Sequence, residues 1–396
     1  MFEVPKTEYE TRLEALRSLM DEQRTGRFLL TNGNWFSYFT GFFYLVTERP
    51  AAMAIGPDRV DFFGPVMEGA HLKTQTTLVD SVTTYLDYPG ETHPAKLFAK
   101  WLKGLKVGTK VGTDGATSFS GYWGYKGPKW SELLPGVKFV PMGDSLYPMR
   151  QVKSSNEQRL IRESIRWGDV AHHLLQKYTE PGLYDFDISA RASLEASMRA
   201  KLALGPRFKA SRWGMVPVHA GFRGQVGEHS VYPHSISIER KIASGDVLGS
   251  GASADIAGYN SEVERNLFVG KPDTRTERFH ELAVKMQDAA LGALKPGGKC
   301  SDADKAVRKF AKSEGLTGYL LHHSGHSIGL EGHEAPFLDV GDNTQVKPGM
   351  VFTVEPGVYV PRLGGFRHSD TVLVRSDSIE VMTHYPRDTE SLTVGF

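Results

Sequence analysis

The sequence contains a single cysteine among its 396 residues, and this scarcity limits the role of sulfur in the chain. One cysteine cannot form a disulfide within the chain, so we expect a reducing, cytoplasmic setting. Cys300 is a candidate nucleophile, but it stands just before a predicted helix with Ser301 as cap, and no histidine is adjacent. We therefore interpret Cys300 as a structural residue.

An excess of either charge sign is also lacking. Lys plus Arg total 47 and Asp plus Glu total 46, a balance that gives no electrostatic basis for binding nucleic acid or an anionic membrane. Apolar runs are short and broken, which excludes a transmembrane helix. The charged start, MFEVPKTEYETRLEALR, has no apolar signal core. No glycine-rich phosphate loop or dinucleotide fingerprint follows a predicted strand, so nothing indicates a nucleotide cofactor.

The length of the chain indicates two domains. Strand-like and helical segments alternate up to about residue 150, as in an α/β unit. The character changes at RQVKSSNEQRLIRES, where Ser155 is the predicted N-cap of a long amphipathic helix. We place the first domain at 1–152 and the second at 153–396. In the second domain, pairs of helices followed by pairs of strands predict an α+β fold whose helices cover one face of a curved antiparallel sheet.

The segment 245–270, GDVLGSGASADIAGYNSEVERNLFVG, has the pattern of two antiparallel strands. A period of two places Glu262 and Glu264 on one face of the second strand. Neighbouring carboxylates repel each other unless a cation, a proton or a metal lies between them, so this face predicts a site for something positive. The alternative is a solvated strand face, with the acids paired to Arg265 or Lys271.

Three further polar clusters fall in the second domain. His234 ends the sequence YPH before the hairpin, His326 and His333 stand in HHSGHSIGLEGHEAP, and Glu355 interrupts the apolar run VFTVEPGVYV. A single histidine is more often a satisfied core or surface residue than a ligand. Glu355 is harder to explain structurally, because a buried carboxylate needs a partner. The glycines around His326 would let the backbone approach a ligand closely.

The segments RQVKSSNEQRLIRES, GHSIGLEGHEAP, KPGMVFTVEPGVYVP and GGFRHSDTVLV together resemble conserved blocks of the pita-bread hydrolases, with the same order and spacing. This family includes methionine aminopeptidase, aminopeptidase P, prolidase and creatinase. The resemblance covers nearly the whole chain, and the first domain resembles the N-terminal domain of the prolidase and creatinase branch. It implies a pita-bread catalytic domain at 153–396, a smaller α/β domain at 1–152, hydrolase activity and a homodimer.

The resemblance also implies where a metal centre would lie. Metallopeptidases of the family hold two metal ions with Asp, Asp, His, Glu and Glu. Those positions fall on Gly251, Glu262, His326, Glu355 and Ser369 in this chain. Two carboxylates are missing, and a hard divalent pair needs several anionic oxygens. We therefore expect no metal cofactor, although the three remaining side chains could hold one ion weakly, as His/Glu/Glu sites hold zinc.

Creatinase is the family member that works without metal, and IAGYNSEVERNLF is similar to its hairpin. The resemblance implies that His234 is the catalytic base and later the acid, a role suited to an imidazole. It implies that Glu264 and Glu355 are catalytic carboxylates that bind a planar cation such as a guanidinium. Glu262 and His326 would then contact the substrate or hold the other acids.

Two more positions are implied to bind substrate. Arg49, in FFYLVTERP, falls on the creatinase arginine that reaches the substrate carboxylate from the other subunit. His333 falls on a second creatinase arginine, where the metallopeptidases also have histidine. Thr47 replaces a creatinase phenylalanine, and these departures argue against creatine itself. We expect substrate choice to depend on loops around 45–50 and 205–230.

Three functions follow from these observations. The leading hypothesis is a metal-independent hydrolase that cleaves a C–N bond in a small zwitterionic substrate, whether guanidino-, amidino- or dipeptide-like. The second is a metal-dependent Xaa-Pro aminopeptidase or dipeptidase. The third is a non-catalytic pita-bread binding protein, which would have no need to retain His234, Glu264 and Glu355.

Overall fold

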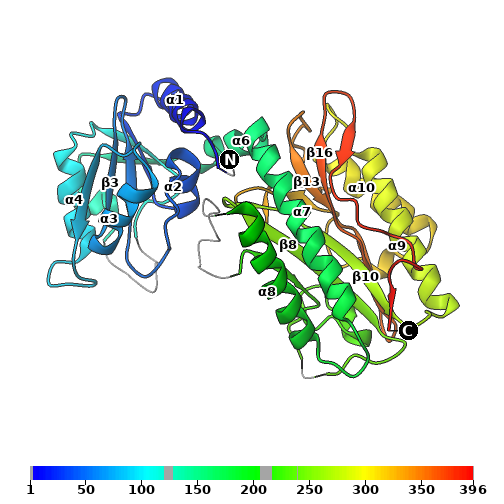
Figure 1. Ribbon diagram of the computed structural model, residues 1–396. Coiled ribbons are helices and arrows are strands. Elements are labelled where there is room, and N and C mark those ends of the chain that lie inside the picture. Colours follow the sequence, from blue (N-terminus) through cyan, green and yellow to red (C-terminus); the bar gives the residue numbers. More distant parts are fainter. Residues whose placement is uncertain (1–2, 120–127, 206–215, 239, 396) are drawn as a thin grey trace. The chain divides into compact units, whose positions relative to one another are not determined.

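The computed structural model describes residues 3–119, 128–205, 216–238 and 240–395 (Figure 1). The chain divides into two compact units, Val4–Arg150 and Gln151–Phe396, and the first few residues belong with the second unit. Each unit is described separately below. Within the described residues, no helix combines the length and the apolar character that a membrane span requires.

The unit Val4–Arg150 is built on one mixed sheet with the strand order β4-β3-β2-β1-β5-β6. Its strands are β1 (Arg27–Leu30), β2 (Ala52–Ile55), β3 (Val60–Pro65), β4 (Ser81–Tyr85), β5 (Lys110–Thr113) and β6 (Lys138–Pro141). Its helices are α1 (Lys6–Glu22), α2 (Gly33–Thr40), α3 (Val66–Gln75), α4 (Pro94–Gly104) and α5 (Trp130–Leu133), and α6 (Gly143–Gln151) ends it. Buried aromatic side chains, among them Phe63, Phe98 and Trp130, pack against β1 and β5 and form part of its core.

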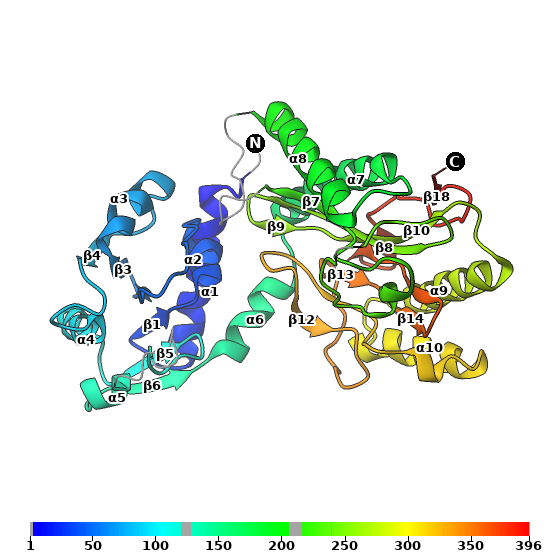
Figure 2. The same ribbon diagram turned by 90° about the horizontal axis from the view of Figure 1, so that it is seen from below.

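The unit Gln151–Phe396 contains two main sheets between two pairs of helices (Figure 2). The first sheet comprises β7 (Val218–Gly221), β8 (Val247–Ile256), β9 (Tyr259–Asn260), β10 (Val263–Val269) and β18 (Thr393–Val394). The second comprises β11 (His326–Ser327), β12 (Glu334–Phe337), β13 (Val351–Val354), β16 (Asp370–Val374) and β17 (Ile379–Val381), and β14 (Gly357–Val360) pairs with β15 (Gly364–Arg367). Helices α7 (Ser155–Tyr178) and α8 (Asp185–Leu204) cover the first sheet, and α9 (Thr274–Ala293) and α10 (Cys300–Ser313) cover the second.

Two helix starts differ by one or two residues from the sequence prediction. The N-cap of α7 is Ser154 instead of Ser155, because the Ser154 hydroxyl accepts the Glu157 N–H while the Glu157 carboxylate accepts the Ser154 N–H. In α10 the N-cap is Lys299 instead of Ser301, so Cys300 is the first helical residue. Cys300 is fully buried, and burial raises the pKa of its thiol to about 12, which disfavours the nucleophilic thiolate.

The predicted hairpin is present as β8 and β10, which pair in antiparallel register with Glu264 opposite Gly251. Glu264 also forms an isolated β-bridge with Ser369, in which each backbone N–H bonds the other's carbonyl oxygen at 3.1 and 3.0 Å. This bridge joins the first sheet to the segment just before β16. As a result, side chains from the hairpin and from the C-terminal strands meet around one space.

Candidate active site

A cavity of about 370 Å³ opens between the hairpin and the C-terminal strands. All of the predicted site residues except Arg49 line this cavity: His234, Glu262, Glu264, His326, His333 and Glu355. Arg49 belongs to the other compact unit, where its guanidinium contacts Glu48. Of the predicted specificity loops, residues 206–215 lie outside the described residues.

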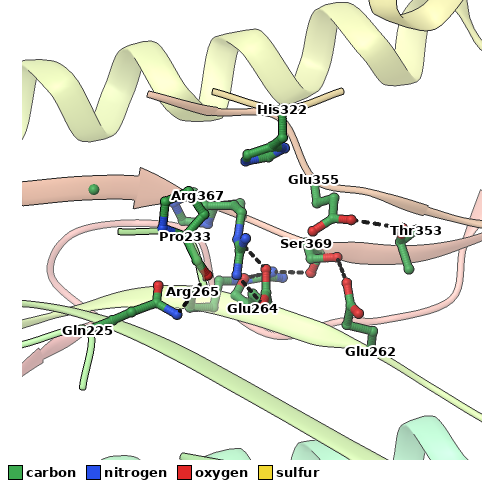
Figure 3. Close-up of polar contacts among 12 residues, drawn as sticks. Gln225, Pro233, Glu262, Glu264, Arg265, His322, Thr353, Glu355, Arg367 and Ser369 are labelled. Atoms are coloured by element: carbon green, nitrogen blue, oxygen red, sulfur yellow. Dashed lines mark hydrogen bonds and ion pairs between the residues drawn. The ribbon is translucent and has the colours of Figure 1, made fainter. Parts of the chain in front are cut away.

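The first group of charges in the cavity, here termed the arginine side, consists of Glu264, Arg367 and Arg223 (Figure 3 draws the first two). Arg367 ends β15 and contacts both oxygens of Glu264, with Nη2–Oε1 and Nε–Oε2 distances of 2.5 Å. Arg223 Nη2 lies 3.7 Å from Oε1 of Glu264. Burial raises the pKa of Glu264, and the two guanidinium groups oppose that rise. Ion pairing at both oxygens thus favours the charged form of Glu264 and opposes the effect of burial.

The second group, here termed the histidine side, consists of Glu262, His326 and Glu355. His326 Nε2 lies 3.1 Å from Glu355 Oε1, and the Ser369 hydroxyl donates to Glu262 Oε1 at 2.7 Å (Figure 3 draws the Ser369 bond). The second ring nitrogen of His326, Nδ1, lies 3.0 Å from its neighbour's backbone carbonyl. If Nδ1 carries its proton toward that carbonyl, Nε2 faces the acids. One possible ligand atom from each of the three side chains lies within 4.8 Å of the other two.

The protonation states on the histidine side follow from burial and mutual charge. Burial raises the pKa of Glu262 to about 8, and the charges of Glu355 and Glu264 add to the rise. Burial alone would raise the pKa of Glu355, but contact with His326 and the charge of Arg367 outweigh burial and lower it to about 2. Burial alone would lower the pKa of His326, but Glu355 and Glu262 outweigh it and raise the pKa to about 9. At neutral pH this side therefore holds an imidazolium, one carboxylate and one protonated carboxyl group.

These contacts explain how the neighbouring carboxylates Glu262 and Glu264 coexist. Glu264 is neutralised by a guanidinium from within the chain, and Glu262 retains a proton. The alternative of a solvated strand face is wrong, because Glu264 is buried and Arg265 instead pairs with Asp370 at 2.7 Å on another side of the strand. The predicted requirement for a positive group is therefore met largely by the protein itself.

The position of Gly251 determines which metal centre the cavity could hold. A Cβ atom at residue 251 would lie 3.4 Å from both Cγ and Oε1 of Glu264, its cross-strand partner. A side chain at residue 251 would thus be in van der Waals contact with Glu264, and Ser369 offers a hydroxyl already committed to Glu262. This donor set does not fit a pair of divalent ions. A single ion fits the three donors of the histidine side, since one imidazole and two carboxylates suit zinc and similar metals.

Several histidines surround these charged groups. His234 lies at the cavity on the segment that follows the short 3₁₀ turn Gly227–Val231, and its side chain is exposed. The His333 ring stacks on that of His326, with centroids 4.0 Å apart. His322 Nε2 lies 2.7 Å from the Tyr359 hydroxyl. The imidazole of His234 therefore lines the cavity and is accessible to water.

Sequence reasoning missed the two arginines of the cavity. Arg367 stands in GGFRHSDTVLV, a block that was singled out only for Ser369 and its neighbours. Its pairing with Glu264 spans 103 residues along the chain and has no local signal. Arg223 lies in HAGFRGQVG. Its adjacency to Gly224 indicates a turn, but it does not indicate that the Arg223 side chain points into a site.

Comparisons with known proteins agree with this architecture. Residues 159–376 match the model of Metallopeptidase family M24, and residues 12–152 match the Creatinase/Prolidase N-terminal domain. A Xaa-Pro dipeptidase of Pyrococcus furiosus is 27% identical over 377 residues, which cover 95% of this chain and 99% of that protein. The uncharacterized peptidase YqhT of Bacillus subtilis is 26% identical over 378 residues, with 95% and 99% covered.

A solved structure of a Xaa-Pro dipeptidase from Bacillus anthracis has a TM-score of 0.80 at 24% identity and covers 98% of this chain and 100% of its own. This similarity confirms the predicted fold class, a pita-bread domain preceded by a smaller α/β domain.

Proposed function

The chain belongs to metallopeptidase family M24, and we propose that it is a hydrolase. We propose further that it cleaves a C–N bond in a small zwitterionic substrate without a dinuclear metal centre. The substrate class includes guanidino, amidino and dipeptide-like compounds. The observation that carries the proposal is the position of Glu264. Its carboxylate lies beside Gly251 and is paired to Arg367, where the family's metallopeptidases have an aspartate that binds metal.

The proposed chemistry uses side chains alone. His234 takes a proton from water as the oxygen attacks the carbon of the C–N bond, and it returns that proton to the leaving nitrogen as the bond breaks. Glu355 and Glu264 orient the cationic part of the substrate and stabilise its charge. Proton transfer by one positioned group contributes typically ~10²–10⁴-fold to a rate, so orientation and electrostatics must supply the remainder.

A second candidate function is a Xaa-Pro dipeptidase that uses one metal ion. Two observations favour it: the curated relative and the solved structure cited above are Xaa-Pro dipeptidases, and the donors of the histidine side lie close enough to share an ion. Glu262, His326 and Glu355 would hold that ion, and Glu262 would lose its proton on binding. A bound divalent ion would polarise a peptide carbonyl or lower the pKa of a bound water. His234 and His333 would then contact the substrate.

Metal analysis combined with activity assays separates the two functions. The purified chain would be assayed with creatine, ectoine and glycyl-proline before and after chelation, with products measured by mass spectrometry. Turnover that survives chelation supports the proposed function. Tight stoichiometric metal with chelator-sensitive cleavage of glycyl-proline would support the second candidate instead. No turnover of any compound in either state would leave a binding protein as the better description.

The role of His234 is tested by His234→Ala, for which we expect a loss of ~10²–10⁴-fold in kcat. His229→Ala is the matched control, because His229 lies in the same segment but does not line the cavity. An unchanged kcat in His234→Ala would reject the assignment of the base.

We also propose that Arg49 acts across a homodimer. This predicts that Arg49→Ala raises KM. It also predicts that dimers formed from tagged wild-type and variant subunits have a KM between those of the two pure proteins.

A further inference from the structure

Arg223 occupies an unusual turn at the cavity. The Gln225 N–H bonds the Phe222 carbonyl oxygen at 2.8 Å, and the two residues between them, Arg223 and Gly224, have φ values of 51° and 72°. Two consecutive positive φ values are the pattern of a type I′ turn. Such turns prefer asparagine, aspartate or glycine at the first central position, so an arginine there is conformationally costly.

The surroundings of the turn hold Arg223 in this strained conformation. The Gly224 N–H donates to the buried carboxylate of Asp185 at 2.9 Å. A Cβ at Gly224 would lie 1.9 Å from the Ile236 carbonyl oxygen, so the backbone is packed too closely for any side chain there. The position of the Arg223 backbone is therefore fixed, and its side chain starts from a rigid base. A strained residue held in place beside a cavity is a sign of a functional role.

The guanidinium of Arg223 keeps donors available to a ligand. It lies 3.7 Å from Glu264 Oε1, which is beyond hydrogen-bonding distance, and its side chain is 48% exposed. Both Glu264 oxygens already contact Arg367. Arg223 thus faces the cavity with five N–H groups and a charge that Glu264 does not fully offset. Arg223 and the carboxylate of Glu355 line the same cavity, which therefore presents both signs of charge and suits a compact zwitterion.

We propose that Arg223 is a specificity-determining residue whose guanidinium binds the carboxylate of the substrate while Glu264 and Glu355 face its cationic part. This inference rests on the proposed function and deepens it, because it adds an arginine of the catalytic unit to the recognition of the anionic end proposed for Arg49. The carboxylate of the substrate would accept two parallel N–H bonds from the planar guanidinium of Arg223. A substrate without a free carboxylate would then bind poorly.

The test measures binding and not turnover. Creatine, ectoine and glycyl-proline would each be titrated beside the corresponding carboxamide into the full-length wild type and into Arg223→Asn, by calorimetry. Wild type is expected to bind at least one acid at least ~10-fold more tightly than its amide, and Arg223→Asn is expected to bind the two about equally. Arg223→Lys, which keeps the charge but loses the planar fork, should retain part of the preference.

Arg362→Asn is the matched control. Arg362 is also an exposed arginine in a tight turn with a positive φ of 62°, but it does not line the cavity. Both asparagine variants relieve the same backbone strain and should melt at or above the wild-type temperature, so loss of folding cannot explain a loss of binding. Only Arg223→Asn should lose the preference for the acid.

The outcomes separate this inference from the proposed function. An acid preference that persists in Arg223→Asn, or wild type that binds none of the three acids, overturns the role of Arg223. Failure of the proposed hydrolysis would appear as absence of product, while the difference in binding between acid and amide would remain.

Discussion

The two sides of the cavity stabilise their carboxylates against burial in different ways. On the arginine side, Glu264 is paired through both oxygens to Arg367, a guanidinium whose side chain is 11% exposed and which keeps its charge at any physiological pH. On the histidine side, Glu262, His326 and Glu355 balance one another by sharing protons: burial raises the pKa of Glu262 to about 8, and the neighbouring acids raise the pKa of His326 to about 9. The pair of Glu264 and Arg367 is permanently compensated, whereas the histidine side can change its charge or accept a cation.

This difference explains why the cavity keeps a single possible metal position. Arg367 already occupies the role of counter-ion beside Glu264, so a second ion there would meet a fixed positive charge. The histidine side has no such cation built in apart from the imidazolium itself, which a metal can replace by displacing a proton. The four predictions below test this contrast, from the largest expected effect to the smallest.

Restoring the missing ligands should convert the arginine side into a second metal position. In the variant Gly251→Asp/Glu264→Thr/Ser369→Glu, the two added carboxylates offset the charge of Arg367, and removal of Glu264 makes room for a longer side chain at residue 251. We expect a second divalent ion to bind at least ~10³-fold more tightly than to the wild type, which is about 4 kcal/mol. Calorimetry with Mn²⁺ and elemental analysis would measure affinity and stoichiometry.

The control for this prediction is Gly251→Asp alone. Its carboxylate would be added beside Glu264, whose Oε1 would lie 3.4 Å from the new Cβ. Repulsion between the two acids should then destabilise the fold without creating a site. Tight binding of two ions by the single variant, or by the wild type, would contradict the contrast between the two sides.

Removing the buried cation should destabilise the protein strongly. Arg367→Met leaves Glu264 buried without its partner, and breaking a buried pair in this way costs about 3–5 kcal/mol. Urea unfolding at neutral pH would measure the loss. The double variant Arg367→Met/Glu264→Gln should recover much of it, because no unpaired charge remains. As a control, Arg375→Ala breaks an ion pair with Glu380 whose arginine is 46% exposed, which should cost only ~0–1 kcal/mol.

The histidine side predicts a loss of stability on the alkaline side. The Glu262 carboxyl has a pKa raised from 4.5 to about 8, so ionising it opposes folding as the pH rises through that range. The His326 pKa is raised from 6.5 to about 9, so its stabilising charge is complete below about pH 6.5 and lost as the pH passes about 9. Ionisation of Glu262 therefore reduces the free energy of unfolding between about pH 4.5 and 8, and loss of the His326 charge reduces it between about pH 6.5 and 9.

Glu262→Gln isolates this effect. Wild type should lose at least about 1.4 kcal/mol more than Glu262→Gln between acidic and alkaline pH, which is the free energy of one pKa unit, because only wild type has a carboxyl whose ionisation opposes folding. Urea titrations at several pH values would give the slopes. Glu281→Gln, whose side chain is 65% exposed in the wild type, should have the wild-type slope. Parallel slopes for wild type and Glu262→Gln would show that folding does not raise the pKa of Glu262.

The smallest effect is expected at Ser369, where the two sides meet. Ser369→Ala removes the hydroxyl that donates to Glu262 at 2.7 Å, which should cost about 1 kcal/mol. Thermal melting would measure the change. Ser378→Ala, which removes an exposed hydroxyl bonded to Asp377, should be neutral. A loss of stability in Ser369→Ala larger than that in Arg367→Met would contradict the expectation that the pair of Arg367 and Glu264 matters more for stability than the Ser369 hydroxyl.

The sequence predicted the features that depend on local patterns and on the family resemblance. The hairpin of β8 and β10, the alternation that sets Glu262 and Glu264 on one face, and the family itself are confirmed. The residue roles, the absence of metal and the subunit arrangement stay predictions.

The remaining features of the site depend on contacts that the sequence does not encode locally. Arg367 and Arg223 reach Glu264 from separate segments, and periodicity within one strand cannot indicate which distant side chain will neutralise it. The protonation of Glu262 depends on burial and on two neighbouring acids together, which is a property of the folded cavity. The helix caps at Ser154 and Lys299 were each missed by one or two residues, because neighbouring polar residues competed for the cap.

The pairing of Gly251 with Glu264 has a consequence for how related proteins are compared. Directly opposed positions in an antiparallel ladder point their side chains to the same place, so an acid lost from one strand can be replaced from the other. Column-by-column alignment records such an exchange as one lost residue and one unrelated gain. Comparing the acids at each pair of opposed strand positions would show which family members carry the negative charge on the neighbouring strand and which have lost it.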